Sequence, residues 1–183
     1  MYYNGSKESA KMEVNMDADL YLNHIEKVLS SNFAIKKNVP IIDRKIDLYG
    51  FWTMEFGRSF LTKDKVIDKF ECNEHCFVIK KDRLDKEGVD DFISYLKRGA
   101  KEVVKPHKDH KTTYITGIMI CNDVMNDDIN NMIKRFKYTK NYKLSFYGWS
   151  SIKLIVVNLK KEEIYYNSIA KEFMNNLTFE KVE

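Results

Sequence analysis

Acidic and lysine side chains between Asp43 and Asp47 have types and spacing that could support catalysis. Asp43 and Lys45 have acid-x-Lys spacing, and Asp47 follows with the same parity. A divalent metal needs two or three carboxylates, and a nearby lysine can stabilise charge on a phosphate. With Glu71 as a further carboxylate, these residues would suit metal-dependent cleavage of a phosphodiester. The simpler interpretation is the solvated face of a strand, because roughly four such triplets are expected by chance in a chain so rich in lysine and acids.

The order of the expected elements supports the same hypothesis. A helix, a three-stranded meander, a second helix and a further strand form the skeleton of the PD-(D/E)XK nuclease fold. The acid-x-Lys motif of that fold usually lies on the later pair of strands, where this chain has Glu71-Cys72-Asn73 and no matching lysine. A metal-dependent PD-(D/E)XK-like nuclease, or a degenerate relative that binds nucleic acid, is therefore the alternative function and not the preferred one.

Cysteines and histidines in two segments could supply ligands for zinc. Cys72 and Cys76 enclose His75, and His107 and His110 form a second group. Thiolates and imidazoles from two loops can build a tetrahedral site, although structural sites usually have Cys-x2-Cys or Cys-x4-Cys spacing. We favour an interpretation without metal, in which the cysteines are buried or half-buried small apolar residues and the two later histidines lie on a surface loop.

Other patterns typical of catalysis or cofactor binding are absent from the sequence. Cys121 with His107 or His110 could form a nucleophile pair, but no glycine-rich turn for an oxyanion accompanies them. Gly-x-Gly-x-x-Gly, the P-loop and Gly-x-Ser-x-Gly are also missing. We therefore expect no cofactor, and the sequence favours a protein without enzymatic activity.

A basic, aromatic segment over residues 134–143 could contact nucleic acid or another anion. Lysines can neutralise phosphates, and a tyrosine can stack on a base. The candidate residues are Lys134, Arg135, Lys137, Tyr138, Lys140 and Lys143. Lysines at the end of a helix also complement the helix dipole, so the segment has a structural interpretation as well.

Alternation of apolar and polar residues from Ile41 to Phe56 predicts a long strand. Large side chains also occupy the parity opposite the main apolar set, at Tyr49 and Phe51. Either helices cover both faces of this strand, or one face lines a pocket or a subunit contact. Tyr49, Phe51 and Trp149 are the candidate pocket residues, although packing in a core is the preferred explanation.

Periodicity along the rest of the chain predicts the other elements. Helical spacing predicts helices over residues 18–31, with Asp17 as the cap, and 82–105, with two more near 123–136 and 165–177. Strands are expected over residues 33–37, 41–56, 66–72, 75–80, 112–121, 142–149 and 152–159, with a hairpin turn at Asn73-Glu74. This order predicts an α+β fold with a mostly antiparallel mixed sheet of about six to seven strands packed with about four helices.

Length and composition indicate one globular domain over residues 17–183, preceded by a flexible N-terminal tail over residues 1–16. The chain has 183 residues, 44% of them apolar, and a net charge of +4, which permits an anionic partner without requiring one. Three cysteines make no disulfide framework, and no apolar run is long enough to span a membrane. We therefore expect a cytoplasmic protein without a membrane partner.

Two segments resemble those of a family of small uncharacterised bacterial proteins, a domain of unknown function. The first is Tyr147–Leu159, and the second combines Ile46–Tyr49 with Asn73–Val78. The resemblance would cover most of residues 18–177. It implies a compact bacterial cytoplasmic domain and offers no catalytic residue for comparison.

A soluble domain that acts through binding or self-association, without catalytic activity, is the function that these observations favour. The ligand and the partner are unknown from sequence, and a homodimer or larger homo-oligomer is an open alternative. Nucleic acid is a further candidate partner through the basic segment.

Overall fold

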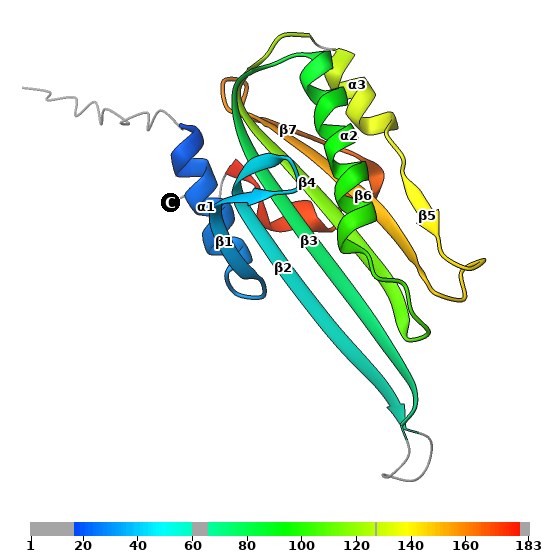
Figure 1. Cartoon of the computed structure of the whole chain (residues 1–183). Helices are drawn as coiled ribbons and strands as arrows, with labels where there is room; N and C mark the ends of the chain where they lie inside the picture. The colour runs from blue at the N-terminus through cyan, green and yellow to red at the C-terminus, as the bar shows by residue number, and fades with distance from the viewer. Residues whose placement is uncertain (1–16, 60–65, 127, 180–183) are drawn as a thin grey trace, which may run out of the picture.

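Runs of β-branched and aromatic residues form a seven-stranded mixed sheet in the computed structural model, which describes residues 17–59, 66–126 and 128–179 (Figure 1). The strands lie in the order β1-β2-β3-β4-β6-β5, and β7 also pairs with β6. Their bounds are β1 Ala34–Ile41, β2 Arg44–Ser59, β3 Val66–Leu84, β4 His110–Val124, β5 Thr139–Asn141, β6 Trp149–Asn158 and β7 Glu163–Tyr166. The predicted α+β class is confirmed, and the number of strands agrees with the prediction. The predicted strand over residues 142–149 is wrong, because residues 143–147 form a turn with positive φ values before β6, and β7 was not predicted. The predicted N-terminal tail lies outside the described residues.

The directions of the strands differ from the prediction at the centre of the sheet. β1, β2 and β3 form the expected antiparallel meander, but β3 pairs parallel with β4, and β4 pairs parallel with β6. A helix connects β3 to β4, and such crossovers join parallel strands. "Mostly antiparallel" was therefore too strong a description, because the buried central strands are parallel.

Three α-helices lie within the described residues: α1 (Ala18–Leu29), α2 (Lys86–Val103) and α3 (Asp128–Arg135). Asp17 caps α1 by accepting a hydrogen bond from the backbone N of Leu20 at 2.7 Å, and Asp85 caps α2 by accepting one from Gly88 N at 2.8 Å. These caps satisfy N–H groups that have no partner within the helix. Amphipathic spacing predicted all three helices, and the predicted cap at Asp17 is confirmed.

The predicted fourth helix, near residues 165–177, is wrong. Tyr165 belongs to β7, and two short 3-10 helices follow, at Ser168–Ala170 and Phe173–Asn176. Pairing with β6 overrides the helical spacing of this segment, since tertiary contacts routinely override local preference. Ala170, Met174 and Leu177 are nevertheless buried. The apolar pattern therefore indicated burial of this segment correctly but predicted the wrong type of secondary structure.

Each face of the sheet carries its own core. α2 and α3 cover one face, called here the α2 face, and α1 with the two 3-10 helices covers the other, called the α1 face. On the α2 face, Gly117 lets α2 approach closely, because a Cβ there would lie 2.3 Å from Leu96 Cδ1. On the α1 face, the Tyr21 hydroxyl donates a hydrogen bond to the carbonyl O of Leu177, which ties the first helix to the end of the domain.

The predicted hairpin turn at Asn73-Glu74 is also wrong, because β3 runs without a break through both residues. Asn73 and Glu74 pair with β2 on one side and with β4 on the other. Polar residues inside a strand mimic a turn signal. Here, backbone pairing with β2 and with β4 keeps Asn73 and Glu74 in the extended conformation.

The β2–β3 hairpin projects beyond the rest of the sheet (Figure 1). Pairing of β1 with β2 ends at Ala34 and Phe51, and pairing of β3 with β4 begins at Glu71 and His110. Residues 55–59 and 66–70 therefore form a two-stranded ribbon, called here the arm. An isolated two-stranded ribbon is at best marginally stable in water.

Candidate functional site

The candidate nuclease residues are not gathered at one place. Asp43 lies in the β1–β2 turn and forms an ion pair with Arg98 at 2.8 Å, and Lys45 is exposed. Asp47 Oδ2 accepts a hydrogen bond from a backbone N–H of β3 at 2.8 Å. Glu71 pairs with residue 55 of β2, eight residues beyond Asp47, which corresponds to about 26 Å along the strand. The convergence of carboxylates that the alternative nuclease site requires is therefore not found for these residues.

Asp47 instead lies near a different group of charges at the start of α1. The backbone N that bonds Asp47 belongs to Lys80, and the Lys80 ammonium forms an ion pair with Asp19 of α1. The hydrogen bond to Asp19 is the main cause that raises the pKa of Lys80. This charged group attaches α1 to β2 and β3.

The candidate zinc ligands lie on opposite faces of the sheet. Cys76 is buried in the core of the α1 face, and Cys72 has the same parity on β3. His110 instead bonds Thr113, an odd-numbered residue of β4. The β4 residues in the core of the α1 face are even-numbered, so Thr113 lies on the α2 face. His107 Nε2 lies 3.1 Å from Glu71 Oε2. Among the residues described, no three His, Cys, Asp or Glu side chains are placed to hold a metal. The alternative of one zinc site from these four residues was therefore wrong.

Burial also raises the pKa values of the thiols, which weakens them as nucleophiles at neutral pH. It raises the pKa of Cys72 and raises that of Cys121 to about 12. Burial first, and the neighbouring Glu74 second, raise the pKa of Cys76. Because the thiolate is the reactive form, thiols with raised pKa values are inert at neutral pH.

His110 is a structural residue in the interior, and the expectation that it lies on the surface was wrong. It is 3% exposed, and both ring nitrogens have partners. Nδ1 lies 2.6 Å from the carbonyl O of Tyr147 and donates to it, because a carbonyl oxygen can only accept, and Nε2 lies 2.9 Å from Thr113 Oγ1. These bonds attach the loop before β6 to the start of β4.

His75 lies on the α2 face among aromatic rings. Its Nδ1 is 2.7 Å from the hydroxyl of Tyr49, and its ring centroid is 4.8 Å from that of Phe51. Burial lowers the pKa of His75 to about 4. The imidazole is therefore neutral at pH 7 and packs as part of the core.

Acid is expected to destabilise the protein through His75. The unfolded chain has a histidine pKa near 6.5, so it binds more protons than the folded protein between pH 6.5 and about 4. The contribution of neutral His75 to the free energy of unfolding is fully present above pH 6.5. It is lost as the pH falls towards 4, by a total on the order of 3 kcal/mol. Urea denaturation across this range measures the effect.

A His75→Phe variant is the control for this titration. It should lack the part of the pH dependence that belongs to the imidazole, while retaining the ring packing with Phe51. If wild type and variant lose stability in parallel between pH 6.5 and 4, His75 does not carry the effect.

The three candidate pocket residues do not share a cavity. Tyr49 packs against Phe77 on the α2 face, with ring centroids 5.3 Å apart. Trp149 packs edge-on against Tyr114 at 5.4 Å, and alternation along β4 and β6 places both on the α1 face. Tyr49, Phe51 and Trp149 therefore do not line one common pocket.

Trp149 instead belongs to a part of the α1 face that the described helices leave uncovered. Three rows of paired residues cross the strands there. The first row, over β2, β3, β4 and β6, is Trp52, Glu74, Tyr114 and Ser151, and the second, over the same strands, is Met54, Cys72, Thr112 and Trp149. The third row is Phe56 of β2 and Phe70 of β3. The apolar and aromatic residues of these rows, with the arm residues Phe56 and Phe70, are called here the open face. Met54 and Phe56 are 40% and 50% exposed. Sequence alternation already placed Trp52, Met54 and Phe56 on one side of the strand, but it could not show that the helices of the described residues leave them uncovered.

A buried ion pair marks the edge between the covered core and the open face. Lys153 Nζ lies 2.8 Å from Glu74 Oε1, and both residues are less than 10% exposed. Thr116 Oγ1 donates to the same carboxylate oxygen. The ammonium lies 4.1 Å from the ring centroid of Tyr114 and 5.2 Å from that of Phe173. The sequence signal for this pair is a lone lysine inside the apolar strand β6.

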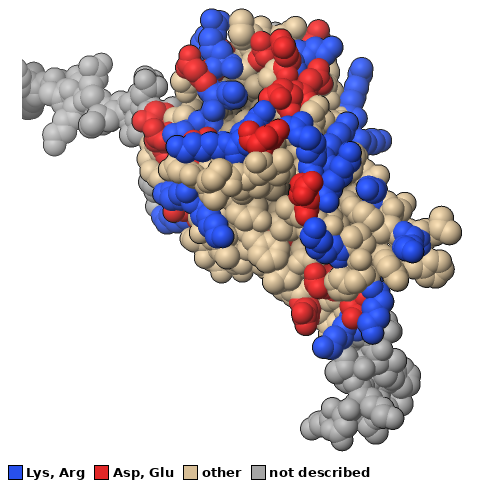
Figure 2. Space-filling model, in the orientation of Figure 1, with Lys and Arg blue, Asp and Glu red and all other residues tan. Residues whose placement is uncertain are grey.

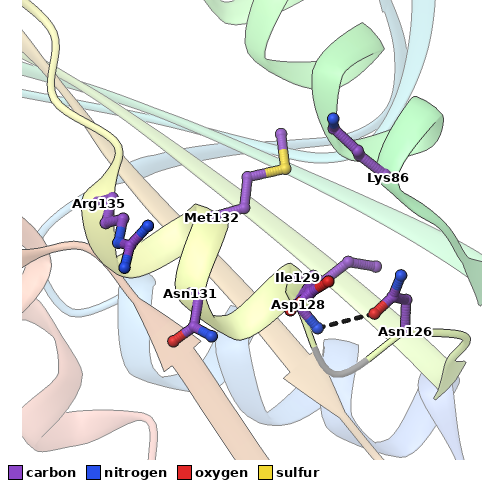
Figure 3. Close-up of a pocket in the computed structure, with 7 residues that line it drawn as sticks. All are labelled: Lys86, Asn126, Asp128, Ile129, Asn131, Met132 and Arg135. Atoms are coloured by element: carbon purple, nitrogen blue, oxygen red, sulfur yellow. Dashed lines mark hydrogen bonds between the residues drawn. The ribbon is translucent and has the colours of Figure 1, made fainter.

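The candidate anion-binding residues extend from α3 through β5 to the next loop. All except the half-buried Tyr138 are exposed. A shallow cavity of about 460 Å³ lies beside α3, and Arg135 and Lys86 both line it (Figure 3). Met132, Ile129, Asp128 and two asparagines form the rest of its wall, so it carries both signs of charge. Figure 2 shows that lysine and arginine also mix with acidic residues over the visible surface.

Comparison with known proteins places this domain in a family without assigning its chemistry. Searches of curated proteins and of solved structures gave no match. Within the described residues, no helix has the length and apolar character needed to cross a bilayer. Residues 17–179 match the domain of unknown function DUF8052. This match covers the described domain from the cap of α1 to the C-terminal segment, and the chain belongs to that family.

Proposed function

We propose that this domain acts by binding a macromolecular partner or a second copy of itself, without catalysing a reaction. The observation that carries the proposal is the open face, where exposed Met54 and Phe56 lie beside half-buried Trp52, Tyr114 and Trp149. Contiguous exposed apolar patches on soluble proteins mark interaction sites. Aromatic residues and methionine are also the types enriched at interfaces.

The shape of the open face suits a broad partner. It extends over four neighbouring strands, which corresponds to a width of about 14 Å, and the arm lengthens it on one side. Its buried charges, Glu74 and Lys153, neutralise each other. An apolar partner surface could therefore cover the face without burying an unpaired charge.

A photo-crosslinking amino acid in place of Phe56 tests this function. We expect a covalent protein adduct in cells that make the full chain, because position 56 lies at the proposed contact. The matched control replaces Met125, which is 56% exposed and is outside the open face, and should give no adduct. Absence of an adduct at position 56, or the same adducts at both positions, would contradict the proposal.

The second candidate is a PD-(D/E)XK-like nuclease or a degenerate relative that binds nucleic acid. The observation that favours it is the order α1, a β1–β2–β3 meander, α2 and β4, with Asp47 and Asp19 both bonded to Lys80. Incubation of DNA with the purified protein and Mg²⁺ or Mn²⁺ tests it. Cleavage or binding that Asp47→Asn abolishes, with folding intact, would favour this candidate.

A further inference from the structure

The loop between β5 and β6 exposes the two most accessible large apolar side chains of the described residues. Leu144 is 91% exposed and Phe146 is 80% exposed. The loop projects beyond the sheet (Figure 1), and in the same orientation Figure 2 shows mainly uncharged atoms there with basic atoms at their edge. Full exposure of two such side chains is unfavourable in water.

The backbone holds these side chains outward in a defined conformation. Three successive residues other than glycine, Lys143, Leu144 and Ser145, have φ values of 48°, 53° and 72°. Hydrogen bonds within the loop fix this shape, including Phe146 N to Lys143 O at 3.0 Å and Tyr147 N to the carbonyl of Tyr142 at 3.1 Å. Strained conformations of this kind persist only where surrounding structure maintains them, and they concentrate at functional sites.

Cations and tyrosines surround the base of the loop. Lys140 Nζ lies 5.3 Å from the Tyr142 ring centroid, and Lys143 Nζ lies 5.8 Å from that of Tyr147. The sequence has no Asp or Glu from residue 129 to residue 161, so no acid of this segment opposes those lysines. The carbonyl groups of His110 and Lys111, at the start of β4, approach Gly148 closely. This start of β4 and the loop before it add basic residues against one acid, Asp109.

We infer that this loop binds the surface of an anionic lipid bilayer, with Leu144 and Phe146 inserted among the acyl chains. The tip is apolar, and behind it lie the tyrosines and lysines that suit the headgroup level of a membrane. Lysines near an anionic surface add electrostatic attraction to this apolar anchor. The aliphatic Leu144 favours lipid over nucleic acid, because nucleic-acid contacts use stacking rings. This inference concerns a different surface from the open face and does not depend on it.

Co-sedimentation of the purified full chain with vesicles tests the inference. We expect binding to vesicles of phosphatidylglycerol and phosphatidylcholine, and at least tenfold weaker binding to phosphatidylcholine alone. Leu144→Ser with Phe146→Ser, and separately Lys140→Glu with Lys143→Glu, should each weaken binding to the anionic vesicles at least tenfold. These side chains are exposed, so unchanged thermal unfolding should confirm that both variants fold.

Matched variants at the other end of the sheet serve as controls. Met125→Ser removes a different exposed apolar side chain, and Lys45→Glu with Lys86→Glu makes the same change of charge, so both should bind like wild type. Equal binding to both kinds of vesicle, or no binding to either, would overturn the inference. Binding to duplex DNA that needs the loop lysines but not Leu144 and Phe146, without vesicle binding, would also overturn it and assign the loop to nucleic acid.

Discussion

Replacing Lys153 with methionine is expected to lower the free energy of unfolding by about 3–5 kcal/mol. The substitution leaves the Glu74 carboxylate inside the protein without its cation, because the pair is buried and its two charged atoms are 2.8 Å apart. The hydroxyl of Thr116 would remain as the partner of one carboxylate oxygen, which cannot offset the loss of a charge. Urea denaturation at pH 7 measures the effect.

Two further variants separate the buried charge from simple loss of packing. Glu74→Leu combined with Lys153→Met should recover most of the lost stability, because replacing both members of a buried pair by apolar residues is often neutral. Lys160→Met removes a lysine whose ion pair with Asp123 is solvent-exposed, and should cost far less stability than Lys153→Met. Equal costs for Lys153→Met and Lys160→Met would show that the pair contributes no more than a surface contact.

Replacing Gly148 with alanine is expected to destabilise the fold by about 3 kcal/mol or more. Gly148 has a φ of +69°, which an L side chain adopts at a cost. A Cβ there would lie 2.3 Å from the carbonyl O of Lys111 and 2.6 Å from that of His110. The backbone of β4 would have to move away from the entry to β6, which also disturbs the hydrogen bond between His110 and Tyr147. Denaturant unfolding of the purified variant measures the loss.

Gly99→Ala is the matched control for this substitution. Gly99 lies inside α2, and a Cβ there would be 3.6 Å from its nearest neighbour, an ordinary contact. Alanine favours a helix over glycine by about 0.8–1 kcal/mol, so this variant should be as stable as wild type or more stable. Equal losses for the two alanine variants would contradict a specific requirement for glycine at position 148.

Sequence reasoning recovered most elements because the positions of apolar residues record which side of a helix or strand is buried. Asp17 and the spacing of Tyr21 and Ile25 predicted α1, which buries both. The same logic failed where pairing, not periodicity, decides the outcome. Asn73 and Glu74 look like a turn until β4 is placed beside them, and Tyr165 looks helical until β7 pairs with β6.

The candidate sites were harder to predict because they depend on which strands become neighbours. Glu74 and Lys153 are 79 residues apart, and no local spacing records their contact. Tyr49 and Trp149 are both aromatic and both odd-numbered, but they lie on opposite faces of the sheet. On β2 the odd-numbered Tyr49 lies on the α2 face, whereas on β6 the even-numbered residues lie there. A charged residue in an otherwise apolar strand, as at Lys153, is the sequence signal that such a partner exists.

The bond from Tyr21 to Leu177 bears on how the chain is assembled during synthesis. The N-terminal helix of this domain docks against the C-terminal segment of the same domain, and the Tyr21 ring also lies 5.2 Å from that of Phe179. One layer of the protein therefore cannot close until the ribosome has released almost the whole domain. Until then, apolar surface on the emerging strands is available to other chains, so the domain stays prone to aggregation until its C-terminal segment has emerged.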